Sequence, residues 1–221
     1  MKDSLRTIIF AAVLGTVCAG LLTAASYVLE PYQTANAAAE KYRNIFGVLG
    51  VSYDQDANST ELLKLVKSES NPDGIVTETD DKAKAKIGGM KVFTYVHPQA
   101  GKLYAVEFAG PGLWGPVEGL LCLRSDLKTI HNIAFYKHEE TPGLGAEIEG
   151  DDFCGQFTDK TIAGTEPGIR VRKPGAATGD NEVDGISGAT LTCDKVEAMI
   201  NAISKRIADN REAILKEAGN E

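Results

Sequence analysis

The chain has 221 residues, which suits one domain or one domain with an appendage. Its formal net charge at pH 7 is −8, and Lys and Arg form no basic tract. This balance argues against a nucleic acid or an anionic lipid surface as the main partner.

A long apolar segment near the N-terminus predicts a membrane anchor. Residues 7–29 contain no charged side chain, and a helix of this length measures about 35 Å, enough to cross a bilayer core of about 30 Å. A cleaved signal peptide is the alternative, but the small residues at 35–37 lie far beyond the apolar run. Lys2 and Arg6 outweigh Asp3. We therefore expect an uncleaved single span with a cytoplasmic N-terminus and the rest of the chain outside, in the periplasm if there is an outer membrane.

Two helices are expected after this span. Pro31 is expected to end the span, and the Ala-rich residues 34–49 predict a first helix. Residues 59–67 predict a second, shorter helix with Ser59, Thr60 or both near its cap. We expect both helices to pack against the main domain, with a free stalk as the alternative.

The polar segments that follow lead into the main domain. The sequence Asn-Pro-Asp-Gly at 71–74 predicts a turn, and residues 75–86 are so weakly patterned that they predict a poor strand or a loop. The expected organisation is an anchor over residues 1–30, a helical lead-in over 31–90 and a main domain over 91–221.

Four segments with β-branched and aromatic residues predict two hairpins. The alternation of large and small side chains is typical of strands that are buried on one face. A loop rich in Gly and Pro, residues 110–116, separates the hairpins and carries Trp114, for which a packing anchor is the usual role. The strands are expected over residues 92–96, 103–108, 117–123 and 130–136.

The next segment, Glu-Thr-Pro-Gly-Leu-Gly at 140–145, predicts a tight loop with exposed backbone N–H groups. An ordinary connection between a strand and a helix is the alternative. Beyond it, residues 151–157 predict a short helix and residues 169–173 a strand.

A small-residue turn at 184–192 opens a long C-terminal helix. Ser187, Thr190 and Thr192 offer hydroxyls where helical N–H groups lack partners, so a Ser/Thr cap is one interpretation. A site for an anion such as a phosphate is the other. Apolar residues further along fall on one helical stripe and predict core, namely Val196, Met199, Ile200, Ile203, Ile207 and Ile214.

The cysteines and histidines show no metal-binding or redox spacing. Cys18 lies in the apolar N-terminal segment, and we expect Cys122, Cys154 and Cys193 to be buried, reduced thiols. The histidines are expected at surface or strand positions, namely His97, His131 and His138.

Two of these segments resemble the motifs of one family. Asp-Gly-Ile-Ser-Gly-Ala-Thr at 184–190 is similar to the flavinylation sequence of bacterial FMN-binding domains, and residues 140–145 are similar to a second motif of that family. Together with the anchor, the strand pairs and Gly-Leu-Trp-Gly at 112–115, they resemble the C subunits of sodium-translocating NADH:quinone oxidoreductases. The G subunits of ferredoxin-linked electron-transport complexes are the closest alternative.

The resemblance implies covalent FMN on Thr190. A dedicated flavin transferase would join the Thr190 oxygen to the FMN part of FAD through a phosphoester and release AMP, so this chain would be the substrate of that reaction. Asp184 would be read by the transferase. The flavin would then carry electrons one at a time between other membrane subunits of the oxidoreductase, and this chain would be an electron carrier rather than a catalyst on its own.

The other candidate site residues follow from the same resemblance, in an α+β fold with mostly antiparallel strands and flanking helices. The alternatives from other classes are a binding module for another phosphate ligand and a structural subunit that carries no cofactor. Thr141, Leu144, Gly145 and Trp114 are expected near the ring, and Ser187, Gly188, Ala189 and Lys173 around the phosphate and ribityl chain.

Overall fold

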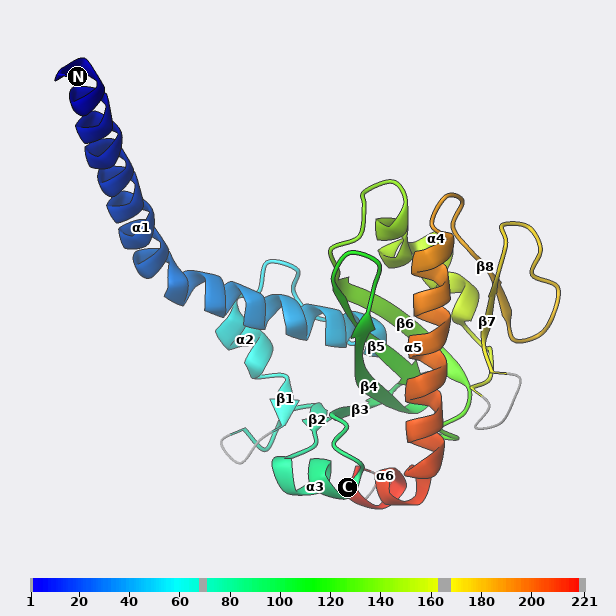
Figure 1. The fold of residues 1–221 in the computed structure, drawn as a ribbon. Helices are drawn as coiled ribbons and strands as arrows, with labels where there is room; N and C mark the ends of the chain where they lie inside the picture. The colour runs from blue at the N-terminus through cyan, green and yellow to red at the C-terminus, as the bar shows by residue number, and fades with distance from the viewer. Residues whose placement is uncertain (1, 68–70, 163–167, 219–221) are drawn as a thin grey trace. The chain divides into compact units, whose positions relative to one another are not determined.

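The computed structural model describes residues 2–67, 71–162 and 168–218, drawn in Figure 1. The chain divides into two compact units, Met1–Glu40 and Lys41–Glu221.

The first unit is helical throughout its described length. The helix α1 runs Lys2–Leu49 without interruption, so the helix expected over residues 34–49 is not separate but continues from the span, although the candidate span itself ends at Glu30 as expected. A proline costs about 3 kcal/mol inside a helix, and the apolar and Ala-rich segments on either side evidently outweigh that cost. Within α1, Leu5–Glu30 is long and apolar enough to cross a membrane, at about 39 Å for its 26 residues. Its apolar side chains, Phe10 and Leu22 among them, face outward, which suits a lipid environment rather than water.

The second unit is built around one six-stranded sheet. Its strands lie in the order β1-β2-β3-β4-β5-β6, and every neighbouring pair is antiparallel except β1 with β2. The expected mostly antiparallel α+β fold is therefore confirmed, with both hairpins in place. The strands are β1 (Val66–Lys67), β2 (Val76–Glu78), β3 (Val92–His97), β4 (Gly101–Pro111), β5 (Pro116–Leu123) and β6 (Ile130–Lys137).

Helices cover both faces of the sheet. Along β4, Tyr104, Val106 and Phe108 belong to the main core, which they share with apolar residues of α5 (Thr190–Asp209). Figure 1 shows α5 lying along the sheet, and it packs beside β4. The expected stripe of apolar residues from Val196 to Ile214 is buried in this core.

The last turns of α1 cover the other face. Lys41 forms an ion pair with Glu107 of β4 at 2.5 Å, and the Tyr42 hydroxyl donates to Glu78 of β2 at 3.3 Å. Phe46 is fully buried in the same segment. Residues 41–49 therefore contact β2 and β4 within the second unit.

Two further predictions between the anchor and the sheet need correction. The second helix, α2 (Ser59–Leu63), is shorter than expected, because Val66 and Lys67 pair with β2. Its cap is Asn58, whose side chain and that of Glu61 bond each other's backbone N–H groups in a capping box. The weakly patterned residues 75–86 form β2 and the helix α3 (Asp81–Lys86), which begins after the cap residue Asp80. The turn at 71–74 forms as expected.

The remaining elements follow the sheet and position the C-terminal part. A 3-10 helix, η1 (Gly145–Glu149), leads to α4 (Asp151–Cys154) and η2 (Gly155–Phe157), so the expected short helix at 151–157 is confirmed. The expected strand near residue 170 is β7 (Arg170–Arg172), which pairs in parallel with β8 (Glu182–Asp184) in a separate small sheet. After α5 the chain turns at Asn210 into α6 (Arg211–Glu217), so the C-terminal helix is divided in two.

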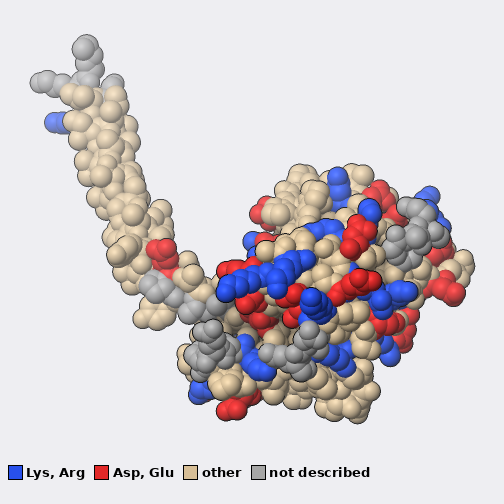
Figure 2. Space-filling model, turned by 90° about the horizontal axis from the view of Figure 1, so that it is seen from below, with Lys and Arg blue, Asp and Glu red and all other residues tan. Residues whose placement is uncertain are grey.

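Charges of both signs are mixed over the surface of the second unit. Figure 2 shows Lys and Arg interspersed with Asp and Glu on the face in view, without a patch of one sign. Several of these side chains form ion pairs, such as Lys86 with Glu217 and Lys205 with Asp209. This face therefore offers no basic surface for a polyanion.

Candidate functional site

Thr190 is the first residue of α5, and its side chain is exposed. The N-cap position before it is held by Ala189, and the structure records no side-chain cap for this helix. The alternative interpretation as a Ser/Thr cap therefore does not hold, because the Thr192 hydroxyl donates to Glu140 and the Thr190 side chain is exposed. The first N–H groups of a helix without such a cap remain available to an anion.

The turn that precedes α5 lies against the loop at 140–145. Gly188 has a φ of +77°, a conformation that favours glycine. A Cβ on Gly188 would approach Leu144 Cδ2 to 2.9 Å. The backbone of the 187–190 segment therefore meets Leu144, one of the residues expected near a flavin ring.

A cysteine lies close to Thr190 but is poorly suited to covalent chemistry. Cys193 is buried, its Sγ accepts the Ile186 N–H at 3.3 Å, and burial raises the pKa of its thiol. It is therefore protonated at neutral pH and a weak nucleophile. Cys122 and Cys154 are also buried and free, as expected. The exposed hydroxyls at this turn belong to Ser187 and Thr190, and Thr190 is the one at the start of α5.

The carboxylate of Glu140 brings the three expected motifs together. It accepts hydrogen bonds from the Leu113 N–H at 2.6 Å and from the Thr192 hydroxyl at 2.7 Å. Leu113 belongs to the Gly/Pro loop, Glu140 to the second motif and Thr192 to the start of α5. Leu113 and Thr192 are 27 and 52 residues away from Glu140 in the sequence, so three distant segments meet at one buried side chain.

Trp114 does not have the packing role that is usual for such a residue. Its side chain is 68% exposed, and the loop Ala109–Pro116 borders a hollow of about 570 Å³. Leu144 and Leu191 are also exposed.

The pairing of β7 with β8 in the small sheet places Lys173 beside the flavinylation-like turn. Arg172 pairs with Asp184 across β7 and β8, and the Gly185 N–H donates to the Arg172 carbonyl at 2.7 Å. Lys173 follows directly, with an exposed side chain. The structure therefore brings its backbone close to Gly185 and leaves its ammonium group on the surface.

Asp184 has a structural role that the motif did not reveal. Its Oδ1 accepts the N–H groups of Ala176 and Ala177 at 2.8 and 2.9 Å, which fixes the loop after Lys173. The backbone of Asp184 is itself held by Gln156, whose side chain bonds both its N–H and its carbonyl. Asp184 therefore shapes the loop that carries Lys173.

Glu182 supports the same loop. It accepts the N–H groups of Thr178 and Gly179 at 3.1 and 3.0 Å and forms an ion pair with Arg172. The hydrogen bond from Arg172 lowers the pKa of Glu182 to about 2. Its carboxylate is therefore ionised over the whole physiological range.

Sequence reasoning missed Glu140 and Gln156. No local pattern separates Glu140 from its exposed neighbour Glu139, since both follow β6 directly. Gln156 lies in a short helix whose partners are distant in the chain. The glycines around Glu140 were the available signal, but they are equally compatible with an ordinary loop.

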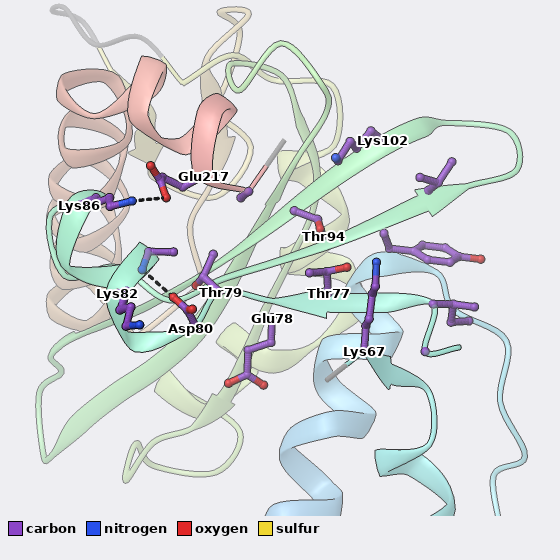
Figure 3. A pocket seen from close by; sticks show the side chains of 16 residues that line it. Lys67, Thr77, Glu78, Thr79, Asp80, Lys82, Lys86, Thr94, Lys102 and Glu217 are labelled. Carbon is purple, nitrogen blue, oxygen red and sulfur yellow. Dashed lines mark hydrogen bonds and ion pairs between the residues drawn. The ribbon is translucent and has the colours of Figure 1, made fainter. Parts of the chain in front are cut away.

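A separate cleft of about 530 Å³ lies away from these residues. Figure 3 shows that its lining side chains come from β1 to β4, α3 and α6, with Lys86 and Glu217 paired at 2.9 Å. Lysines and carboxylates both line it, and none of the expected flavin-site residues contributes to its wall. It is therefore a different feature from the site at Thr190.

Comparison with known proteins identifies the domain that holds this site. The family model for the FMN-binding domain matches residues 112–205, a range that contains Trp114, the 140–145 loop, Lys173 and Thr190. The match covers less than half of the chain, but it includes every residue that the sequence analysis expects near a flavin.

The curated relatives that this chain resembles share one description. The chain is 26% identical to the C subunit of the Na(+)-translocating NADH-quinone reductase of Pseudomonas aeruginosa, over 90% of this chain and 91% of the relative. It is 28% identical to the same subunit of Pasteurella multocida, over 88% of each chain. The crystal structure of the C subunit from Parabacteroides distasonis matches 87% of this chain and 98% of its own, with a TM-score of 0.60 and 26% identity. The resemblance to C subunits is therefore confirmed.

The first testable prediction concerns Asp184. Replacing it in Asp184→Ala removes two hydrogen bonds to a carboxylate, each worth about 1.5–3 kcal/mol. The amides of Ala176 and Ala177 should then exchange hydrogen about ten- to a hundredfold faster, because each 1.4 kcal/mol is about a factor of ten. Hydrogen exchange measured by mass spectrometry tests this. Asp180→Ala, at an exposed position of the same loop, is the matched control, and unchanged exchange in Asp184→Ala would contradict the assignment.

Proposed function

We propose that this chain is the flavoprotein subunit of a sodium-translocating NADH:quinone reductase and carries FMN joined covalently to Thr190. The match to the FMN-binding domain family and the relatives described as C subunits support the reductase assignment. The geometry at the start of α5 supports the attachment site.

The observation that carries the proposal is the exposed Thr190 hydroxyl at the uncapped start of a twenty-residue helix. A phosphoester at this oxygen would place phosphate charge beside the free N–H groups of the first turn, where the helix dipole favours an anion. Gly188 and Ala189 leave little side-chain bulk on the approach to this oxygen. Ser187 is exposed beside them and supplies a further hydroxyl.

The residues around Thr190 fit a flavin. Leu144 and Trp114 offer exposed apolar surface for a ring, and both lie on loops tied to the start of α5, one through Gly188 and the other through Glu140. Thr141 is exposed on the same loop as Leu144, and its carbonyl accepts the N–H groups of Leu144 and Ala146 at 3.1 Å. We assign Thr141, Leu144, Gly145 and Trp114 to the ring.

Within such a complex, bound FMN would supply one-electron transfer between other membrane subunits. The role of this chain is to hold and orient the group. In maturation by a flavin transferase, Thr190 Oγ forms the bond to the FMN phosphorus while the bond from that phosphorus to AMP breaks, and the hydroxyl proton leaves with AMP. A covalent bond keeps the cofactor in place even at an exposed site.

We further propose that Leu5–Glu30 anchors the chain as a single span, with the FMN-binding domain on the outer side of the cytoplasmic membrane. The positive balance of Lys2 and Arg6 over Asp3 supports a cytoplasmic N-terminus. Protease added to intact spheroplasts should therefore digest residues 41–221. Protection of this domain until the membrane is disrupted would contradict the orientation.

The attachment at Thr190 predicts a specific mass. The full chain co-expressed with a flavin transferase should gain the mass of one FMN less one water, and its flavin absorbance should survive denaturation. Thr190→Ala should abolish both, because the acceptor oxygen is lost. Ser187→Ala is the matched control, since it removes a neighbouring exposed hydroxyl and should retain the added mass.

Each other outcome has a clear meaning. A native chain that gains no flavin would favour a module for a different phosphate ligand or a purely structural subunit. Flavin that is released by denaturant would contradict the covalent link.

Lys173 is proposed to pair with the FMN phosphate. Lys173→Met should lower the flavin occupancy reached early in flavinylation by up to about fivefold, because loss of an exposed ion pair worth about 0.2–1 kcal/mol slows the attachment. It should also shift the flavin midpoint potential to more negative values, since a nearby positive charge that favours the added electron is lost. Lys205→Met, on the distal part of α5 where the lysine pairs with Asp209, is the control. Unchanged occupancy and potential would show that Lys173 is merely solvated.

A further inference from the structure

The carboxylate of Glu140 is buried where three segments of the flavin site meet. Its side chain belongs to a residue that is only 5% exposed. Oε1 accepts the Leu113 N–H at 2.6 Å and, more weakly, the Trp114 N–H at 3.4 Å. Oε2 accepts the Thr192 hydroxyl at 2.7 Å. One side chain therefore joins the Gly/Pro loop to the first turn of α5.

Two glycines make room for this carboxylate. A Cβ on Gly145 would lie 2.6 Å from Glu140 Oε2 and 2.8 Å from Thr192 Oγ1. A Cβ on Gly112 would collide with Oε1. The second motif and the Gly/Pro loop each supply one of these glycines, so both are shaped around the same two oxygens.

The loop that carries Trp114 has few other means of holding its position. Leu113 and Trp114 are 42% and 68% exposed, so burial of their side chains contributes little. The Gly112 N–H donates to the Gly115 carbonyl at 2.8 Å, which closes the loop on itself without attaching it to another segment. β4 and β5 fix the base of this hairpin, and Glu140 fixes its tip against α5.

The hydrogen bonds also make the segments depend on one another. A buried carboxylate is costly unless its oxygens are hydrogen-bonded. Here each oxygen takes its donor from a different segment, so loss of either contact leaves part of the charge unsatisfied. The position of the Leu113–Trp114 backbone is thereby coupled to that of Thr192, two residues after Thr190.

We propose that Glu140 is the positioning residue of the flavin site. Through the Leu113 N–H and the Thr192 hydroxyl it sets the place of the Trp114 loop relative to the start of α5, and so the space beside Thr190 in which a flavin ring is held. Glu140 acts through these neighbours and does not touch the cofactor. This role rests on the proposed function, because it concerns a group attached at Thr190.

A flavin-free experiment tests the mechanical part. Trp114 is the single tryptophan of the chain, so its fluorescence reports on this loop directly. In full-length Thr190→Ala protein in detergent, adding Glu140→Ala should lower the fluorescence anisotropy of Trp114, because the loop tip gains freedom. Adding Glu140→Gln should preserve the anisotropy, since an amide oxygen can accept from the Leu113 N–H and an amide nitrogen can donate to the Thr192 hydroxyl. Glu147→Ala, at an exposed carboxylate of η1, is the control, because Glu139 lies against Gly115 of the same loop.

A second experiment tests the effect on the flavin in otherwise native chain co-expressed with a flavin transferase. Intact mass first establishes FMN on the native chain and on each variant. Glu140→Ala should retain the added mass but show several-fold brighter flavin fluorescence that is more accessible to iodide, because an indole held against a flavin quenches it. Glu140→Gln should restore the native fluorescence.

The outcomes separate the two proposals. A native chain without the FMN mass would refute the proposed function and with it a role for Glu140 at a flavin. A flavinylated native chain combined with unchanged anisotropy and fluorescence in Glu140→Ala would overturn the positioning role alone. So would a Glu140→Gln variant that behaves like Glu140→Ala, because charge rather than connection would then be responsible.

Thr192→Val keeps the test decisive if Glu140→Ala fails to fold by circular dichroism. It removes the donor on α5 with little change in shape and leaves the bond to Leu113 in place. Its Trp114 anisotropy should fall between those of the native loop and a freely moving indole. A folded Thr192→Val protein with native anisotropy would overturn the proposal.

Discussion

The site at Thr190 depends on a buried carboxylate that accepts hydrogen bonds from two distant segments. Placing Glu140 out of water is unfavourable unless its oxygens are satisfied, and the donors that satisfy it come from the β4–β5 loop and from α5. The fold can bury this group only by bringing those segments together. The same contacts that offset the desolvation cost therefore assemble the site.

The oxygen proposed as the FMN acceptor is exposed, while the helix that carries it is well packed. Thr190 begins a helix whose apolar stripe is buried in the core against β4, so the position of its backbone is set by packing over the whole length of α5. Cys193, one turn further, points into the protein and is protonated. A surface modification site on a well-packed element combines access for a modifying enzyme with a fixed position for the attached group.

The strands could be predicted from the sequence, whereas several helix boundaries could not. Alternating apolar residues specify a strand locally, and the two hairpins appear where this pattern lies. The helix α1 continues past Pro31, where a separate helix was expected, and the helix expected up to Lys67 ends at Leu63. In both cases the surrounding structure outweighed the local sequence preference. In the second case Val66 and Lys67 gained partners on β2, which lies about ten residues further along the chain.

Within the site, the sequence by itself determined the chemistry and the tertiary structure decided the geometry. The small-residue turn with Thr190, the second motif and the apolar anchor are all local patterns, and local patterns can be recognised in a sequence. The choice of Glu140 over Glu139 as the buried carboxylate, the exposure of Trp114 and the order of the strands depend on contacts between residues far apart in the chain. No local pattern encodes such contacts, because they exist only once the sheet and α5 have packed together.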